Sequence, residues 1–128
     1  MTLHHSGFIV ENIDLWEKQM AFEEKVNDVF DPIQNSRLTL YKNFCSCYIE
    51  LIQPMNEQSL SWNSLQRAGN HFNHFCYSVN TMEEMEMVTS KFRLLPVAAP
   101  VPAVLFNNKK VAFYYSLNRQ MVEFLIEN

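Results

Sequence analysis

The segment His5-Ser-Gly-Phe-Ile-Val-Glu-Asn-Ile13 has a counterpart further along the chain, His74-Phe-Cys-Tyr-Ser-Val-Asn-Thr-Met82. Each is followed by a short β-rich segment that contains a glutamate, Tyr48-Ile-Glu50-Leu-Ile52 in the first half and Val122-Glu123-Phe-Leu-Ile126 in the second. Each half therefore supplies one histidine and one glutamate. If the halves fold alike and pack about a pseudo-two-fold axis, the four side chains meet at one point, and such a ligand set suits a divalent metal.

Composition indicates a globular protein of one domain, residues 1–128, because the 128 residues are 48% hydrophobic and can bury a core of their own. The net charge of −4 and thinly spread Lys and Arg argue against a nucleic-acid partner. No apolar run approaches the roughly 20 residues of a membrane span, and no leader-like segment opens the chain. Three cysteines match neither a zinc knuckle nor a redox pair, so we expect reduced thiols in a cytoplasmic protein.

Hydrophobic periodicity predicts the same order of elements in both halves. In a first module, residues 1–54, a strand over 2–10 precedes a helix capped by Asn12, and three strands follow, at 26–30, 37–42 and 47–53. A linker, 55–69, contains a short helix over 60–68. In the second module, 70–128, a strand over 73–79 precedes a helix that starts at the capping box Thr81-Met-Glu-Glu84, and the remaining strands are expected at 94–97, 111–116 and 121–126. The predicted fold class is α+β, with two paired βαβββ modules.

The least regular stretch is 96–102, which contains three prolines. Proline lacks the N–H that a central strand needs, so this stretch cannot be a central strand throughout. We expect an edge strand or a loop over the mouth of the site.

Side chains alternate between the two faces of a strand, and in the four repeated strands the residue types separate by parity. One parity carries residues suited to packing under helices: Phe8, Val10, Ile49, Leu51, Phe75, Tyr77, Val79, Val122, Phe124 and Ile126. The other parity carries the two histidines and two glutamates, with smaller or mixed neighbours such as Gly7, Ile52, Cys76, Ser78 and Leu125. One face is thus predicted to be core and the other to line a cavity.

A glutamate on the inner face of a sheet loses hydration worth several kcal/mol unless a cation, a donor or a proton compensates. No Lys or Arg shares these strands at the matching parity, and two neutral histidines beside two glutamates leave a negative charge. A divalent ion would neutralise it. A single strand histidine is more often a surface or satisfied core residue, and His4, beside His5, is assigned to that class.

These residues give the chain a resemblance to the vicinal oxygen chelate superfamily, in the branch of glyoxalase I and methylmalonyl-CoA epimerase. It rests on His-His-Ser-Gly-Phe-Ile-Val at the start, Ile-Glu-Leu-Ile-Gln-Pro at 49–54, Asn-His-Phe-Cys-Tyr-Ser-Val at 73–79 and Met-Val-Glu-Phe-Leu-Ile-Glu at the end. The resemblance implies a half-open mixed β-barrel around a central metal held by His5, Glu50, His74 and Glu123. Zn²⁺, Ni²⁺, Co²⁺ or Mn²⁺ would all be suitable.

The branch shares proton transfer at a carbon next to a carbonyl, with the metal stabilising the enolate. The resemblance implies a metal-dependent isomerase, epimerase or lyase in which Glu123 is the base and Glu50 its partner for redelivery. The substrate would be a small molecule with a carbonyl and an adjacent oxygen, an acyl thioester among the candidates. The fold is often dimeric, so the four ligands could come from one chain or from two chains of a homodimer.

The chain also departs from the branch. Ile9 stands where bacterial glyoxalase I usually has an arginine for glutathione, and the strand at 37–42 lacks the carboxylate found in several epimerases. The pocket is therefore expected to be rebuilt, with Tyr48, Cys76, Phe113, Tyr115 and Met121 as candidate lining residues. Two alternatives share the fold: a non-enzymatic ligand-binding or resistance protein, and a dioxygenase or thiol transferase variant. Glu50 argues against the dioxygenase and transferase, which have two histidines and one glutamate.

Overall fold

The computed structural model describes residues 1–128 and has nine strands, three α-helices and one 3-10 helix. In chain order they are β1 (Thr2–Ile9), α1 (Ile13–Gln19), β2 (Glu24–Asp31), β3 (Ser36–Lys42), β4 (Tyr48–Pro54), α2 (Trp62–Ala68), β5 (His71–Val79), α3 (Met82–Lys91), β6 (Leu95–Pro96), β7 (Val101–Ala103), η1 (Val104–Phe106), β8 (Lys109–Tyr115) and β9 (Met121–Ile126). The predicted α+β class is confirmed, although four strands follow α3, β6 to β9, where three were expected. None of the helices has the length and apolar character that a membrane crossing requires.

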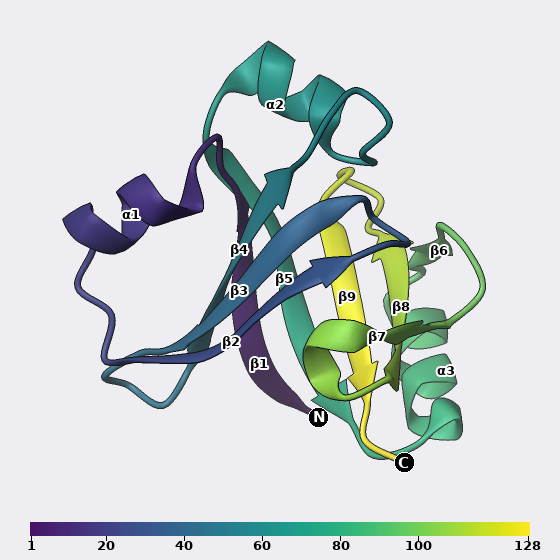
Figure 1. The fold of residues 1–128 in the computed structure, drawn as a ribbon. Helices are drawn as coiled ribbons and strands as arrows, with labels where there is room; N and C mark the ends of the chain where they lie inside the picture. The colour runs from purple at the N-terminus through teal and green to yellow at the C-terminus, as the bar shows by residue number, and fades with distance from the viewer.

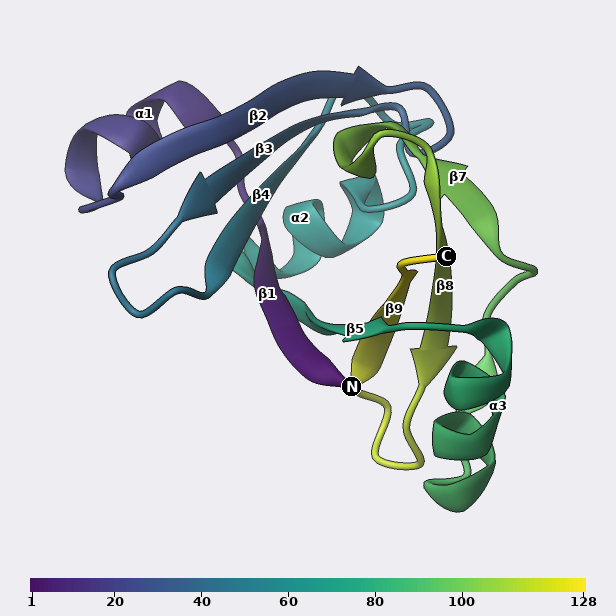
Figure 2. The same cartoon turned by 90° about the horizontal axis from the view of Figure 1, so that it is seen from below.

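All strands belong to one mixed sheet, in the order β2-β3-β4-β1-β5-β9-β8-β6, with β7 also paired to β8 (Figure 1). In each half the His strand pairs in parallel with the Glu strand, β1 with β4 and β5 with β9. The two halves join where β1 and β5 run antiparallel, which we call the seam. The sheet curves strongly, with α1 and α3 outside the curve (Figure 2). It remains open and is not a closed barrel.

The helices start where the sequence predicts. Asn12 accepts a hydrogen bond from the Leu15 N–H at 3.0 Å, which caps α1, and Thr81 accepts one from the Glu84 N–H at 3.1 Å, which caps α3. Each helix covers one part of the convex face. The cluster under α1 contains Val10, Ile13, Tyr41 and Leu51, and the cluster under α3 contains Val79, Met85, Ala112, Phe124 and Ile126.

Phe75 is a correction to the predicted core. It has the parity of a core residue, but 39% of its surface is exposed. The reason is that α1 and α3 lie over opposite ends of the convex face (Figure 1), and neither helix's core cluster includes Phe75. Phe75 instead packs against the ring of Phe72, with ring centroids 4.7 Å apart.

The proline-rich stretch forms an interrupted edge. The two short strands β6 and β7 pair with opposite ends of β8, and residues 97–100 loop out between them. The expected edge strand and the expected loop are therefore both present. Opposite this edge, Asn27 of β2 donates a hydrogen bond to the Leu105 carbonyl at 3.1 Å, which ties η1 to the first half of the sheet.

Candidate metal centre

The structure brings together the four side chains that the repeat singled out. His5, Glu50, His74 and Glu123 are each at most 3% exposed, and their ligand atoms all lie within 4.8 Å of one another. The histidines come from the two strands of the seam, and each glutamate comes from the strand beside its histidine strand. All four belong to one chain, so the cluster needs no residue from a second subunit.

The distances within the cluster fit a shared ion. His5 Nε2 lies 3.1 Å from His74 Nε2, 4.0 Å from Glu50 Oε1 and 3.9 Å from Glu123 Oε2. His74 Nε2 lies 3.5 Å from Glu50 Oε1 and 3.0 Å from Glu123 Oε2. Ligands held about 2.1 Å from one ion are roughly 3.0 to 4.2 Å apart, depending on the angle between them. Two imidazoles and two carboxylates in this arrangement could hold a divalent metal.

The strand register explains why the two halves contribute equivalently. The residue paired with each glutamate lies two positions after the histidine of the same half, Gly7 opposite Glu50 and Cys76 opposite Glu123. Across the seam the same two residues face the other half's histidine, Gly7 opposite His74 and Cys76 opposite His5. The pseudo-symmetry inferred from the sequence therefore extends to individual residue pairs.

Gly7 leaves the space that the His74 ring occupies. A Cβ atom at position 7 would lie 2.2 Å from His74 Cε1 and 2.7 Å from both ring nitrogens. Any side chain larger than hydrogen would displace the imidazole, because carbon atoms that close overlap. The glycine is needed for close approach and not for an unusual backbone angle, since Gly7 is not among the residues with positive φ.

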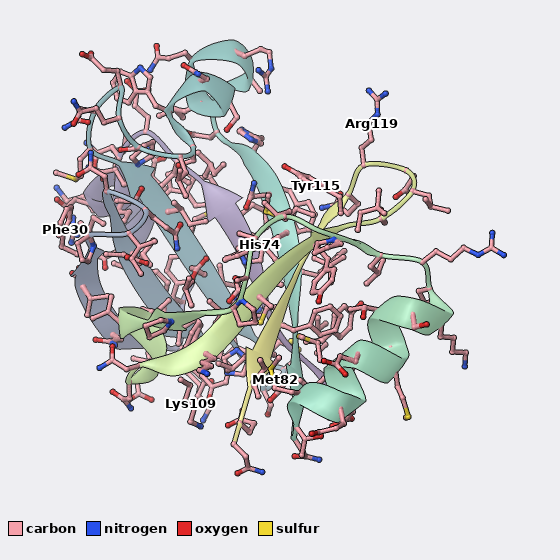
Figure 3. All side chains as sticks on the ribbon, turned by 90° about the vertical axis from the view of Figure 1, so that its right-hand side faces the viewer. Phe30, His74, Met82, Lys109, Tyr115 and Arg119 are labelled. Atoms are coloured by element: carbon pink, nitrogen blue, oxygen red, sulfur yellow. The ribbon has the colours of Figure 1, made fainter.

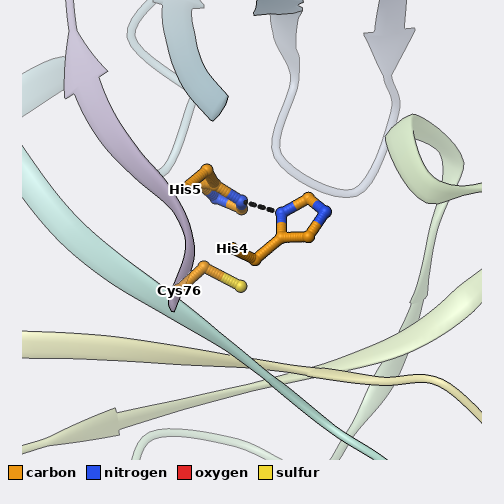
Figure 4. Close-up of side chains that lie close together, drawn as sticks. All are labelled: His4, His5 and Cys76. Atoms are coloured by element: carbon orange, nitrogen blue, oxygen red, sulfur yellow. Dashed lines mark hydrogen bonds between the residues drawn. The ribbon is translucent and has the colours of Figure 1, made fainter. Parts of the chain in front are cut away.

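The residue that precedes each cluster histidine contacts the Nδ1 atom of that histidine's ring. Asn73 Oδ1 lies 2.8 Å from His74 Nδ1, and because this oxygen can only accept, Nδ1 carries the proton and Nε2 presents a lone pair to the cluster. His4 Nδ1 lies 2.9 Å from His5 Nδ1 in the same relation (Figure 4). His4 and Asn73 both lie at shifts in the β1–β5 register, and the bulge at each shift turns the side chain toward the cluster.

Burial and mutual charge shift the pKa values of the cluster. Burial lowers the pKa of His5 well below its ordinary value. Burial also acts to lower the pKa of His74, but the hydrogen bond to Glu123 and the charges of both glutamates outweigh it, so that pKa is raised. Burial raises the pKa of Glu50 to about 8. Without a cation, therefore, the cluster retains protons at neutral pH, and a metal would replace them.

Stability of the metal-free protein is expected to fall as the pH rises from about 6.5 to about 8, above the range in which the lowered pKa values of His4 and His5 act in the opposite direction. Folded Glu50 keeps its proton in this range, whereas unfolded Glu50 ionises near 4.5, so unfolding releases a proton and becomes easier at higher pH. The raised pKa of His74 acts in the same direction. Denaturant unfolding of chelator-treated protein across this range measures the effect, which for one proton is at most about 1.4 kcal/mol per pH unit.

The matched control is Glu50→Gln, which keeps the size and polarity of the side chain and removes the titrating group. Its free energy of unfolding is expected to decline less steeply with pH than that of the wild type. Parallel slopes in the two proteins would contradict the assignment of a retained proton to Glu50.

A cavity of about 460 Å³ opens onto the cluster, and Glu50 and His74 are among its lining residues. Of the pocket residues expected from the sequence, Phe113, Tyr115 and Met121 line it. Tyr48 instead packs into the core cluster and stacks on His4, with ring centroids 4.9 Å apart. Cys76 is fully buried near His4 and His5 and does not line the cavity (Figure 4).

Other lining residues were not anticipated as site residues. They come from the end of β2, from α2 and from the segment between β6 and η1, and include Asp31, Gln34, Ser61, Asn63, Ser64 and Arg67. Asp31 is 4% exposed, and its carboxylate accepts hydrogen bonds from the Ile33 N–H at 2.8 Å and the Gln34 side chain at 3.1 Å. The dipeptide Asp-Pro at 31–32 indicates a turn, and nothing local in the sequence indicates that the turn borders a cavity.

Comparison with known proteins places the chain in a family. The family model of the glyoxalase/bleomycin resistance protein/dioxygenase superfamily matches residues 4–113. The chain belongs to this superfamily, which is the resemblance that the sequence predicted. No curated protein sequence gives a significant match.

Solved structures with the same fold cover almost the whole chain. A hypothetical protein from Bacillus halodurans is 21% identical with a TM-score of 0.83, over 99% of this chain and 94% of that chain. Methylmalonyl-CoA epimerase from Mycobacterium tuberculosis is 18% identical with a TM-score of 0.81, over 99% and 88%. Methylmalonyl-CoA epimerase of Streptomyces coelicolor, solved with 2-nitronate-propionyl-CoA, is 13% identical with a TM-score of 0.79, over 98% and 96%. These similarities establish the fold.

Proposed function

We propose that the protein is a metal-dependent isomerase, epimerase or lyase that moves a proton at a carbon next to a carbonyl. The observation that carries the proposal is the cluster of four buried ligand atoms, two from histidines and two from glutamates, with separations of 3.0 to 4.0 Å beside a cavity. Zn²⁺, Ni²⁺, Co²⁺ and Mn²⁺ all accept nitrogen and carboxylate ligands of this kind. When bound, such an ion polarises a carbonyl oxygen and makes the neighbouring carbon more acidic.

The two glutamates of the cluster would transfer the proton. We assign Glu123 as the acceptor and Glu50 as the group that returns the proton, as the family resemblance implies. Asp31 also lines the cavity, but its carboxylate accepts hydrogen bonds from its own turn, and on β3 the residue that faces Glu50 is Leu40.

The substrate would carry a carbonyl and an adjacent oxygen. The S. coelicolor epimerase was solved with 2-nitronate-propionyl-CoA, and a further methylmalonyl-CoA epimerase structure contains methylmalonyl-CoA, so we include acyl thioesters among the candidates. A glutathione adduct is disfavoured, because Ile9 lines the cavity where glyoxalase I has an arginine. The three free cysteines fit a reducing compartment, and we place the protein in the cytoplasm.

The direct test is metal content in protein purified without chelator. We expect about one divalent ion per chain and a raised melting temperature when Ni²⁺, Co²⁺ or Zn²⁺ is added to metal-free protein. His74→Ala should lose both properties, whereas His71→Ala, a histidine outside the cluster, should keep them. Solvent deuterium incorporation into methylmalonyl-CoA then tests proton transfer on one candidate substrate. Absence of bound metal, together with no thermal stabilisation, would favour the ligand-binding alternative and overturn the proposal.

A further inference from the structure

The cavity beside the cluster has two unlike walls. One wall is apolar and is formed by the segment between β6 and η1, including Val97, Ala98 and Val101. The other is polar and is formed by Ser61, Asn63, Ser64 and Arg67, which we call the α2 wall. A ligand that reaches from the cluster to the opening would therefore contact apolar side chains and also the polar groups of the α2 wall.

Arg67 is the one Lys or Arg among the lining residues, and it forms neither an ion pair nor a hydrogen bond within the chain. Three other cations are in ion pairs: Arg37 with Asp14 and Asp28, Lys25 with Glu17 and Asp28, and Lys109 with Glu127. What distinguishes Arg67 from the other unpaired cations, such as Lys18 and Lys110, is that it lines the cavity. The acidic lining residues do not neutralise Arg67, since Asp31 is held by its own turn and Glu50 belongs to the cluster. The guanidinium at the cavity is thus free to bind an anion.

Ser61 supplies a second, independent observation. Its hydroxyl oxygen is buried and has no hydrogen-bond partner. Ser61 occupies the N-cap position of α2, where a serine hydroxyl normally accepts a backbone N–H, but its side chain makes no such bond. Buried hydroxyl groups in folded proteins are nearly always paired. Because Ser61 also lines the cavity, rotation of its side chain would bring the hydroxyl to an oxygen atom of a bound ligand.

We propose that the α2 wall binds a carboxylate at the far end of the substrate, through a charge-assisted bond from Arg67 and a hydrogen bond from the Ser61 hydroxyl. The inference rests on the proposed function, since it takes the near end of the substrate to be the oxygen pair that binds at the cluster. It names the substrate class: a small carbonyl compound with two chelating oxygens, a short apolar chain that lies against Val97 and Val101, and a terminal carboxylate.

The test compares matched chelators on the metal-loaded protein. A hydroxamate offers two oxygens to a metal, and the monohydroxamates of succinic, adipic and suberic acid differ from butanoyl, hexanoyl and octanoyl hydroxamate chiefly in the terminal carboxylate. Isothermal titration calorimetry gives the affinity of each. For at least one of the three chain lengths, we expect the carboxylate-terminated hydroxamate to bind about tenfold more tightly than its neutral partner. A charge-assisted hydrogen bond has a free energy large enough for this difference.

Single substitutions test which residues cause the preference for the carboxylate-terminated hydroxamates. Arg67→Gln should reduce the preference for the carboxylate to less than about twofold and leave the neutral hydroxamates unaffected, and Ser61→Ala should reduce it by about threefold. Arg119→Gln is the control, because Arg119 stands at the tip of the turn between β8 and β9 and points away from the sheet (Figure 3). It should keep the full preference.

Two kinds of failure are distinguishable. Equal affinity of both members of every pair in the wild type, or a preference that survives Arg67→Gln, would overturn the carboxylate site and leave the metal centre intact. Failure of all the hydroxamates, neutral ones included, to show metal-dependent binding would overturn the proposed function and the carboxylate site together.

Discussion

Replacement of Glu123 by glutamine is expected to lower the rate of solvent deuterium incorporation into a processed substrate by about 10²- to 10⁴-fold, the usual contribution of a positioned base. Glutamine keeps the shape of the side chain and an oxygen ligand but cannot take up a proton. Metal should therefore stay bound while exchange is lost. The measurement is NMR of the exchanging carbon in D₂O, with metal content determined on the same sample.

Glu127→Gln is a suitable control. Glu127 follows β9 directly, and its carboxylate accepts a hydrogen bond from Ser78 at 2.6 Å and pairs with Lys109. It lies outside the four-residue cluster, so its loss should leave exchange unchanged. Exchange at the wild-type rate in Glu123→Gln would remove Glu123 as the proton acceptor. If Glu50→Gln alone abolished exchange, the roles assigned to the two glutamates would be reversed.

Replacement of Gly7 by alanine is expected to weaken metal binding by about 100-fold or more, although position 7 has no ligand atom. The new methyl group would lie 2.2 Å from His74 Cε1, so the imidazole must leave its place. Changes to residues that orient metal ligands typically cost 10- to 100-fold in affinity, and here the ligand itself is displaced. Competition with a chromophoric chelator measures the affinity directly.

Gly69→Ala provides the matched comparison. Gly69 has a φ of 67°, a conformation that alanine adopts only with strain, but no atom lies within 4 Å of a Cβ placed there. We expect Gly69→Ala to reduce stability by roughly 1 kcal/mol and to leave metal affinity unchanged. If both variants lost metal affinity to a similar extent relative to the wild type, the effect of Gly7→Ala would come from reduced general stability and not from displacement of the His74 ring.

The four cluster residues could be predicted because two signals in the sequence agreed. The repeat paired His5 with Glu50 and His74 with Glu123, and strand parity placed all four on the face opposite the apolar side chains. In the structure their ligand atoms lie within 4.8 Å of one another. Parity works here because each of these strands runs without interruption through the residues that follow its ligand.

Parity fails at the bulges, which no sequence pattern indicates. His4 and Asn73 directly precede the ligand histidines, so strict alternation would turn them away from the cluster. A shift in the β1–β5 register instead turns both inward, where each contacts the neighbouring histidine's Nδ1. The shift depends on how two strands far apart in the sequence pair with each other, and neither strand encodes it alone.

The cavity walls were the other part that could not be predicted. Ser61 and Arg67 belong to a linker helix, and segment 97–103 belongs to an interrupted edge, so neither carries a periodic pattern that points to a site. Their position depends on how the sheet curves between them. Phe75 illustrates the same point on the convex face, where its exposure depends on which parts of the sheet the helices cover.

The seam between β1 and β5 also limits how the two halves can move relative to each other. Many enzymes admit substrate by swinging two lobes apart about a hinge. Here each half contributes one histidine directly at the seam, so any such movement would separate His5 from His74 and disrupt the four-residue cluster. An enzyme built on this cluster would therefore have to keep the two halves together. Its ligands would enter past residues 97–103 and α2, which line the cavity.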